Sequence, residues 1–406
     1  MPKTSSLHVK TGKMRPKAVQ FGAGNIGRGF LGQLFFESGY ETVFVDVDAE
    51  LVGELNRRGS YPIRVVGDTS YDIDVHGVRA VDGADTEAVV REVATADIAA
   101  TAVGVKALPA VAEPLARGLE ARFKRPSRPP LDIIVCENMV NAADFLKGKV
   151  GETLSATDKE LLETRVGFVD ASIGRMVPLM TAEQRGEDPL LVLVEEYCEL
   201  PIDKAAFKGP VPPIRHLEPY DNFQAYVERK LYIHNTGHAI AAYLGHLRGH
   251  TFIWEAIGDQ VVRDRVKAAV DESKEALVIR RGLDRSGLDD HIDDLLRRFA
   301  NVALGDTVFR VARDPIRKLG RDDRLVGAAR AAFAAGITPA HIAFGIASAI
   351  FYDEPSDPEA VRLKGVRENE GVEAVLAKFC ELTPDDELYN TVMQAVGTLH
   401  GTDWIC

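Results

Sequence analysis

The chain has 406 residues, more than one hydrophobic core normally serves, so two domains are expected and three are possible. Apolar residues make up 46% of it and charged residues 27%, the balance of a soluble globular protein. With 49 Lys and Arg against 61 Asp and Glu, the formal charge of −12 argues against nonspecific binding to nucleic acid or to anionic membranes.

The first 15 residues are predicted to be a disordered extension. They are basic and contain no apolar core, so they do not resemble a signal peptide, and Met14 is an alternative start. The four cysteines are widely scattered and form no C-x-x-C pair, which favours a reducing, cytoplasmic location.

Residues 16–205 alternate between apolar strand-like runs and amphipathic helical runs. Helices are expected at 25–38, 50–58 and 106–123, and a hairpin at 61–81 inserted into the domain. This alternation predicts an α/β fold, a Rossmann-type dinucleotide-binding domain with a mostly parallel sheet. The expected strands are 18–21, 42–48, 97–104, 131–138, 166–173 and 190–197.

Helical periodicity dominates from Asp221 on, and residues 206–406 are predicted to form a mainly α-helical substrate and catalytic domain. The longest uncharged run, Ala331 to Tyr352, is long enough to suggest a membrane span. However, Gly336, Thr338 and Pro339 follow the pattern of one helix ending and another beginning. Two buried helices are therefore favoured, and no membrane association is expected.

The glycines of "FGAGNIGRG" have the G-x-G-x-x-G spacing between a strand and a helix. Gly22 permits a tight turn, Gly24 lets the backbone approach a pyrophosphate, and Gly27 permits close packing of helix and sheet. A carboxylate at the end of the next strand accepts the ribose hydroxyls of NAD, although use of NADP stays open. The predicted cofactor is NAD, bound by Phe21, Gly22, Ala23, Gly24, Asn25, Ile26, Gly27, Arg28, Gly29, Asp46, Val103 and Gly104.

The segment "KLYIHNTGH" combines a lysine, an asparagine and two histidines on a predicted helix from Asp221 to Leu247. In an α-helix, Asn235 and His238 lie about 140° and about 80° around the axis from Lys230, so all three share one side. A lysine whose pKa is lowered by burial can remove a proton from an alcohol, and the other two groups can hydrogen-bond the same oxygen.

Two other interpretations of this segment are possible. The three polar residues could be an ordinary solvated helix face. The pairs His234/His238 and His246/His250 have i, i+4 spacing, but the glutamate of the zinc-protease pattern is replaced by Asn235. A metal-independent reaction is therefore expected.

Four stretches together resemble the polyol-specific long-chain dehydrogenases: "FGAGNIGRGFLGQL", "CENMVNAADFLK", "DNFQAYVERKLYIHNTGHAIAAYLG" and "DTVFRVARDPIRKLGRDDRL". The resemblance implies NAD-dependent interconversion of D-mannitol 1-phosphate and D-fructose 6-phosphate. It implies that Lys230 is the general acid/base, and that Asn235, His238 and Asn138 polarise the reacting oxygen. It also favours a monomer.

One position departs from the family pattern, because Gly174 stands where relatives often carry an aspartate, for which Asp170 is a conceivable substitute. A phosphorylated substrate also needs basic residues. The candidates are Lys204, Lys208, Arg310, Arg313, Arg317 and Lys318. The alternatives are a mannitol 2-dehydrogenase, a hexuronate (altronate-type) oxidoreductase, or, in another class, a non-catalytic NAD-binding sensor.

Overall fold

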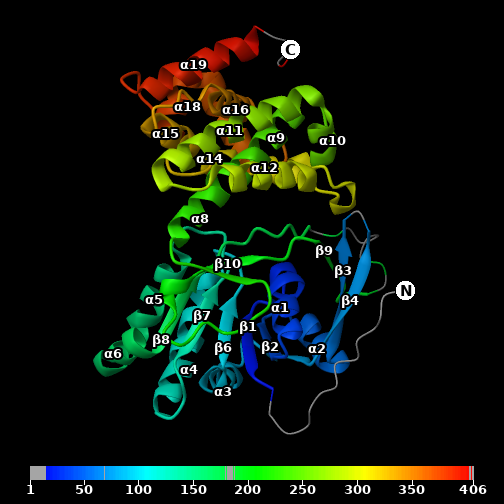
Figure 1. The fold of residues 1–406 in the computed structure, drawn as a ribbon, viewed down its shortest axis with the longest axis vertical. Helices are drawn as coiled ribbons and strands as arrows, with labels where there is room; N and C mark the ends of the chain where they lie inside the picture. The colour runs from blue at the N-terminus through cyan, green and yellow to red at the C-terminus, as the bar shows by residue number, and fades with distance from the viewer. Residues whose placement is uncertain are drawn as a thin grey trace. The chain divides into compact units, whose positions relative to one another are not determined.

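The computed structural model describes residues 15–67, 69–178, 180, 186, 188–401 and 404, and it divides into two compact units, Met1–Asp221 and Asn222–Cys406 (Figure 1). Of the predicted N-terminal extension, residues 1–14 lie outside the described residues. The units divide later than the predicted boundary at 205/206. The reason is that β10 (Leu200–Asp203) pairs with β11 (Leu217–Tyr220), which keeps the proline-rich segment between them in the first unit.

The first unit is built on a parallel six-stranded sheet with the order β5-β2-β1-β6-β7-β8. This is the order of a doubly wound dinucleotide-binding sheet, so the predicted fold class is confirmed. The strands are β1 (Lys17–Phe21), β2 (Glu41–Asp46), β5 (Val78–Asp82), β6 (Ile98–Thr101), β7 (Leu131–Val135) and β8 (Val166–Asp170).

The predicted hairpin is present as β3 (Ser60–Val66) and β4 (Tyr71–His76), which pair antiparallel. Its predicted second strand, which ran to residue 81, was too long, because residues from Val78 on form β5 of the main sheet. A third strand, β9 (Val192–Glu195), adds to β3 in parallel and completes a separate small sheet. The hairpin thus leaves the main sheet after α2 (Ala49–Arg58), and the chain returns to the main sheet at β5.

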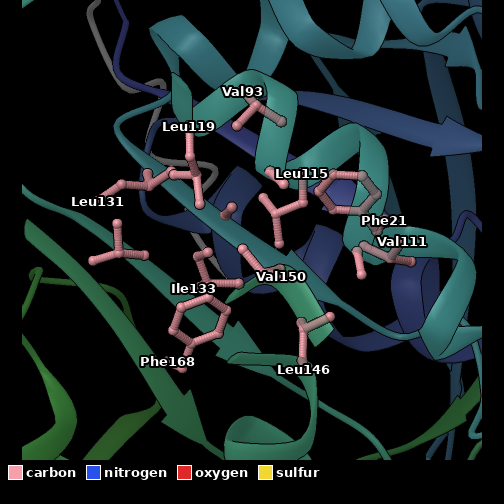
Figure 2. Close-up of a cluster of buried hydrophobic side chains, with 14 of the residues drawn as sticks. Phe21, Val93, Val111, Leu115, Leu119, Leu131, Ile133, Leu146, Val150 and Phe168 are labelled. Atoms are coloured by element: carbon pink, nitrogen blue, oxygen red, sulfur yellow. The ribbon is translucent and has the colours of Figure 1, made fainter. Parts of the chain in front are cut away.

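Both faces of the main sheet are buried, because its strands carry apolar residues on both sides. Val19 and Phe21 of β1 belong to one core cluster, and Ala18 belongs to another. Figure 2 shows the first cluster, in which strand residues such as Ile133 face helix residues such as Leu115. Helices α3 (Thr86–Thr95), α4 (Leu108–Phe123), α5 (Ala142–Thr153) and α6 (Ala156–Arg165) cover this face.

The opposite face is covered by the helix that follows the glycine loop, together with β10 and β11. This helix begins with a π-helical turn, η1 (Gly27–Gly32), and continues as α1 (Gln33–Glu37). Helix ends elsewhere follow local chemistry. Asp48 caps the start of α2 through two backbone N–H groups, and Gly59 ends α2 with a positive φ of 64°. A short 3-10 turn, η2 (Lys204–Ala206), follows β10.

In the described part of the second unit, the regular elements are helices. The predicted helix from Asp221 to Leu247 is present as α8 (Phe223–Arg229), the π-helical turn η3 (Lys230–Asn235) and α9 (Thr236–Leu247). α9 is buried along most of its length and packs against its helical neighbours α10 (Ile253–Gly258), α11 (Gln260–Arg281), α13 (Val308–Ala312) and α16 (Ala340–Ile350). The remaining helices are α12 (Arg285–Phe299), η4 (Val302–Leu304), α14 (Pro315–Lys318), α15 (Val326–Ala334), α17 (Pro358–Glu370), α18 (Val372–Phe379) and α19 (Glu387–His400).

The uncharged run from Ala331 to Tyr352 contains the end of α15 and all of α16, with Gly336 at a positive φ of 77° between them. The prediction of two helices is therefore confirmed. Among the described residues, no helix is both long and apolar enough to cross a bilayer.

Candidate functional site

The three glycines of the glycine loop are needed for different reasons. Gly22 has a φ of +89°, and a Cβ atom on it would lie only 2.4 Å from the carbonyl oxygen of Ala102. A Cβ on Gly27 would lie 2.0 Å from the carbonyl oxygen of Gly22, so the helix can approach the loop only because this residue has no side chain. A Cβ on Gly24 would meet no atom within 4 Å, and the residue is exposed. Open space therefore lies beside Gly24, where a pyrophosphate would need it.

Two polar side chains fix the shape of this loop. Asp46, at the end of β2, accepts a hydrogen bond from the backbone N–H of Ala23 at 2.6 Å and one from the N–H of Asp48 at 3.0 Å. The side-chain amide of Asn25 donates to the carbonyl of Pro178 at 3.2 Å. Asp46 is half-exposed, and each carboxylate oxygen can accept a further bond, so the predicted contact with a ribose stays possible.

Other predicted cofactor residues lie in the interior. Arg28 is buried; its Nε donates to the carbonyl of Ala23 at 2.6 Å and its Nη1 donates to that of Leu190. A Cβ on Gly29 would lie 2.6 Å from the side chain of Val192, so β9 can pack this closely only because residue 29 has no side chain. Arg28 and Gly29 therefore support the glycine loop from the protein interior. Within the loop, the groups accessible to a ligand are the backbone of Gly24 and the half-exposed Asn25 and Ile26. Phe21 is also buried.

Glu137 is a residue that the sequence analysis missed, although its neighbour Asn138 was singled out. Its carboxylate accepts the backbone N–H of Val103 at 2.9 Å and that of Gly104 at 2.8 Å. Glu137 is the last of a run of buried residues that begins at Leu131, and Asn138 is exposed in the bend that follows. Burial raises the pKa of Glu137, opposed by the two N–H groups and the hydroxyl of Thr101. The acidic residue in "CEN" was the only sequence signal, and its partners are distant along the chain.

In the second unit, the π-helical turn η3 begins at Lys230 and ends at Asn235. A π turn closes its hydrogen bonds between residues five apart, so these two residues are one full turn apart and lie on the same side. His238 follows three residues later in α9, which makes it a neighbour of Asn235. The predicted clustering of the three residues on one side of the helix therefore arises from a one-residue insertion that the sequence analysis did not foresee.

The hydroxyl of Thr236 ties this turn to a loop from elsewhere in the unit. Thr236 is completely buried, and its Oγ1 lies 3.1 Å from the carbonyl oxygen of Leu231, five residues back, and 2.6 Å from that of Arg324. One hydroxyl hydrogen therefore serves two carbonyl groups. The backbone of Arg324 is thus held beside η3.

The surroundings of Lys230 lower the pKa of its amine to about 8. Burial is the largest cause, because it disfavours the charged ammonium, and the positive charge of Arg324 acts in the same direction. Asp323 opposes them; its carboxylate also binds Arg324, Oδ1 accepting from Nε at 2.8 Å. An amine with this pKa exchanges protons readily near neutral pH.

His238 is held on two sides. Its ring stacks on Phe299 with centroids 4.5 Å apart, and its Nε2 lies 3.2 Å from Oδ2 of Asp306, although the contact is poorly aligned for a hydrogen bond. Asp306 in turn accepts two bonds of 2.6 Å from Arg310. Burial lowers the pKa of His238, so the ring is neutral near pH 7. With a carboxylate facing Nε2, the proton belongs on Nε2, and Nδ1 is the acceptor.

The histidine pairs that suggested a metal interpretation have other partners. His234 and His238 pack against each other and against Phe299. His246 lies 3.3 Å from Asp353, and His250 lies 3.2 Å from Asp259. Within the described residues, no group of three or more His, Cys, Asp or Glu side chains is placed to hold a metal ion.

Most of the basic residues predicted for a phosphate are engaged by other groups. Lys204 pairs with Asp221, Arg310 with Asp306, and Arg317 with Asp314 and Asp323. Lys318 is buried and donates to the carbonyls of Val311 and Arg313. Arg313 and Lys208 are exposed, and neither makes an ion pair with a described residue.

Gly174, which stands where relatives often carry an aspartate, is packed against the ring of Tyr197. A Cβ on Gly174 would lie 3.1 Å from the ring of Tyr197, which leaves little room for a carboxylate. Asp170 accepts the backbone N–H of Ala143 at 2.9 Å at the start of α5. Its carboxylate therefore serves as a helix cap in the first unit.

The fold and these two sets of residues define a class of protein: a Rossmann unit with a dinucleotide loop, followed by a helical unit that carries a lysine able to exchange protons. Comparison with known families agrees. Residues 16–216 match the mannitol dehydrogenase Rossmann domain, and residues 222–400 match the mannitol dehydrogenase C-terminal domain. The chain belongs to the mannitol dehydrogenase family, so the predicted resemblance is confirmed at that level.

Two solved structures share the fold over nearly the whole chain. Mannitol 2-dehydrogenase of Pseudomonas fluorescens, solved as a ternary complex with NAD and D-mannitol, is 18% identical with a TM-score of 0.78, covering 96% of this chain and 93% of that one. A D-sorbitol dehydrogenase in substrate-free form is 16% identical with a TM-score of 0.81, covering 96% and 94%. At such low identity these likenesses concern the fold.

Proposed function

We propose that this chain interconverts D-mannitol 1-phosphate and D-fructose 6-phosphate with NAD, the reaction of a mannitol-1-phosphate 5-dehydrogenase. Family membership supports oxidoreduction of a polyol, and the Pseudomonas fluorescens enzyme of the same fold binds NAD and D-mannitol. The observation that carries the proposed chemistry is Lys230, whose pKa of about 8 accompanies a position one π turn from Asn235.

In the proposed oxidation, the neutral amine of Lys230 takes the hydroxyl proton of the substrate while the adjacent carbon gives up a hydride. NAD, when bound, supplies the hydride acceptor. In the reverse direction, the ammonium of Lys230 returns the proton to the carbonyl oxygen. The amide of Asn235 donates to the same oxygen and stabilises the charge that develops on it, and Asn138 is proposed as a further donor.

His238 is proposed to orient the substrate. A neutral ring that keeps its proton on Nε2, facing Asp306, can accept a bond from a substrate hydroxyl through Nδ1. It is a poor donor to an alkoxide in that state. The stabilisation of negative charge therefore falls to the two asparagines.

The phosphate is proposed to bind Arg313. It belongs to the same unit as Lys230, it is exposed, and it makes no ion pair with a described residue, whereas Arg310 and Arg317 are already paired. Lys208 is the remaining candidate in the first unit.

An Arg313→Gln variant should raise KM for fructose 6-phosphate about tenfold, as loss of one charge-assisted contact would do, and leave KM for fructose unchanged. Steady-state kinetics of both substrates measures this, with Arg362→Gln as a control at another exposed arginine of the second unit. An unchanged KM for fructose 6-phosphate would remove Arg313 from the site.

The second candidate is a mannitol 2-dehydrogenase, favoured by the shared fold of the Pseudomonas fluorescens enzyme. The deciding experiment follows NADH absorbance after mixing the protein with fructose 6-phosphate or with fructose. The proposal expects oxidation of NADH with the phosphate ester. Activity with fructose alone would establish the second candidate, and NADH binding without turnover of either sugar would indicate a sensor.

A further inference from the structure

Glu137 closes a chain of contacts along the carboxyl edge of the main sheet. Val103 and Gly104 follow β6, and Glu137 follows β7, the neighbouring strand. Gly104 has a φ of +86°, so two successive N–H groups point to the same side and form a small anion-binding concavity. The carboxylate of Glu137 occupies this concavity, with one oxygen for each N–H.

The contacts continue from there to the glycine loop. A Cβ on Gly22 would lie 2.4 Å from the oxygen of Ala102 and 3.2 Å from Cγ1 of Val103, so this segment presses directly on the tight turn of the loop. The ladder bond from Ala102 N–H to the carbonyl of Phe21 joins the same two segments at 2.8 Å. A displacement of Val103 would therefore change the packing around Gly22.

The same residue also constrains Asn138. Glu137 is buried and held by two charge-assisted bonds, whereas the next residue is exposed at the sheet edge where doubly wound folds bind their ligands. The fixed side chain of Glu137 therefore restrains the backbone directly before Asn138, which is exposed in the bend after β7.

We propose that Glu137 is a positioning residue, a clasp that locks Val103 and Gly104 against the glycine loop and orients Asn138 through one carboxylate. The expected effect on NADH binding depends only on the position of the glycine loop in the Rossmann fold. The expected effect on turnover rests on the proposed function, through the proposed role of Asn138. Loss of the clasp should therefore alter both NADH affinity and turnover.

Glu137→Gln tests this, because an amide nitrogen cannot accept either N–H and at least one of the two bonds is lost. We expect Kd for NADH, measured by fluorescence titration of the full chain, to rise about tenfold. At saturating NADH, kcat for sugar-phosphate reduction should also fall about tenfold, since misplaced groups cost rate even when the substrates are bound.

Glu272→Gln is the matched control. Glu272 in α11 also accepts two backbone N–H groups, those of His341 and Ile342, each at 2.9 Å, and burial raises its pKa as well. This variant should lower the melting temperature as Glu137→Gln does, yet keep Kd for NADH and kcat within about twofold of the wild type, because the fold can absorb the loss of a remote bond.

The proposal is overturned if Glu137→Gln keeps both Kd and kcat within that range, or if Glu272→Gln changes them equally. If the glutamine variant fails to fold, Glu137→Asp is measured instead; it retains the charge but is too short to reach both N–H groups, and the same two outcomes decide. The NADH titration needs no sugar. A wild type that binds NADH but reduces no sugar phosphate would refute the proposed substrate and leave the test of the clasp intact.

Discussion

The amine of Lys230 owes its low pKa to a buried position and to Arg324, a residue far away in the sequence. In the proposed reaction the neutral amine is needed for oxidation and the ammonium for reduction. The kcat/KM for polyol oxidation should therefore rise with pH through about 8, and that for ketose reduction should fall over the same range.

Arg324→Gln should move both midpoints to higher pH by about one pH unit, because removing a nearby positive charge makes the ammonium more stable. The measurement is the pH dependence of kcat/KM in both directions. Arg321→Gln, at an exposed neighbour that is not among the charges acting on Lys230, should leave the midpoints in place. Profiles of Arg324→Gln that superimpose on the wild type would contradict the electrostatic role.

At the scale of elements, both predicted functional segments contain a π-helical turn, η1 after the glycine loop and η3 at Lys230. A π turn breaks the regular bonding pattern of the helix and is retained where a geometry depends on it. In η3 the hydroxyl of Thr236 helps to satisfy the carbonyl of Leu231 and also holds Arg324. Thr236 thus links the geometry of the turn to the charge beside Lys230.

Thr236→Val should therefore lower the free energy of unfolding by about 1–3 kcal/mol, because two buried carbonyl groups lose their donor. It should also lower kcat. Chemical denaturation and steady-state kinetics measure the two effects, and Thr236→Ser, which keeps the hydroxyl, is the control. A valine variant with normal kcat would show that the turn is maintained by backbone packing alone.

The glycine loop could be predicted from the sequence because its spacing and its flanking strand and helix are local signals. Lys230, Asn235 and His238 could be selected by residue type, but α-helical geometry spread the first two by about 140°. The extra residue of η3 cannot be recognised from the sequence, because the segment is too short and too mixed in composition to show a change of helical period. Glu137 and Asp306 were missed for another reason: each acts on residues brought to it by folding, and the sequence shows no pairing between them.

At the scale of the molecule, the fold class was predictable because strands and helices alternate in one part and helices alone follow. The boundary was placed too early, since a proline-rich segment reads as a linker and nothing local shows that β10 and β11 pair across it. Arg28 was included with the glycine loop as a predicted cofactor residue. In the structure its guanidinium donates to the backbone carbonyls of Ala23 and Leu190, two segments that folding brings together.

A cofactor that binds only the native first unit should stabilise the full chain. At a concentration of 100 times its Kd, NADH should add about 2.7 kcal/mol, seen as a higher melting temperature in calorimetry. NADPH at the same concentration should add less, because the carboxylate of Asp46 repels a 2′-phosphate. Equal stabilisation by both cofactors would contradict the predicted role of Asp46.

The bond from Ala23 to Asp46 also limits how this protein could be redesigned, or could evolve, to use the other nicotinamide cofactor. Exchanging the acidic residue for a small neutral one would create space for an extra phosphate, but it would leave the Ala23 amide without its acceptor and loosen the loop that receives both cofactors. A successful switch therefore requires a compensating acceptor introduced together with the first change, and single substitutions at this position should yield weaker binding of either nucleotide before they yield a new preference.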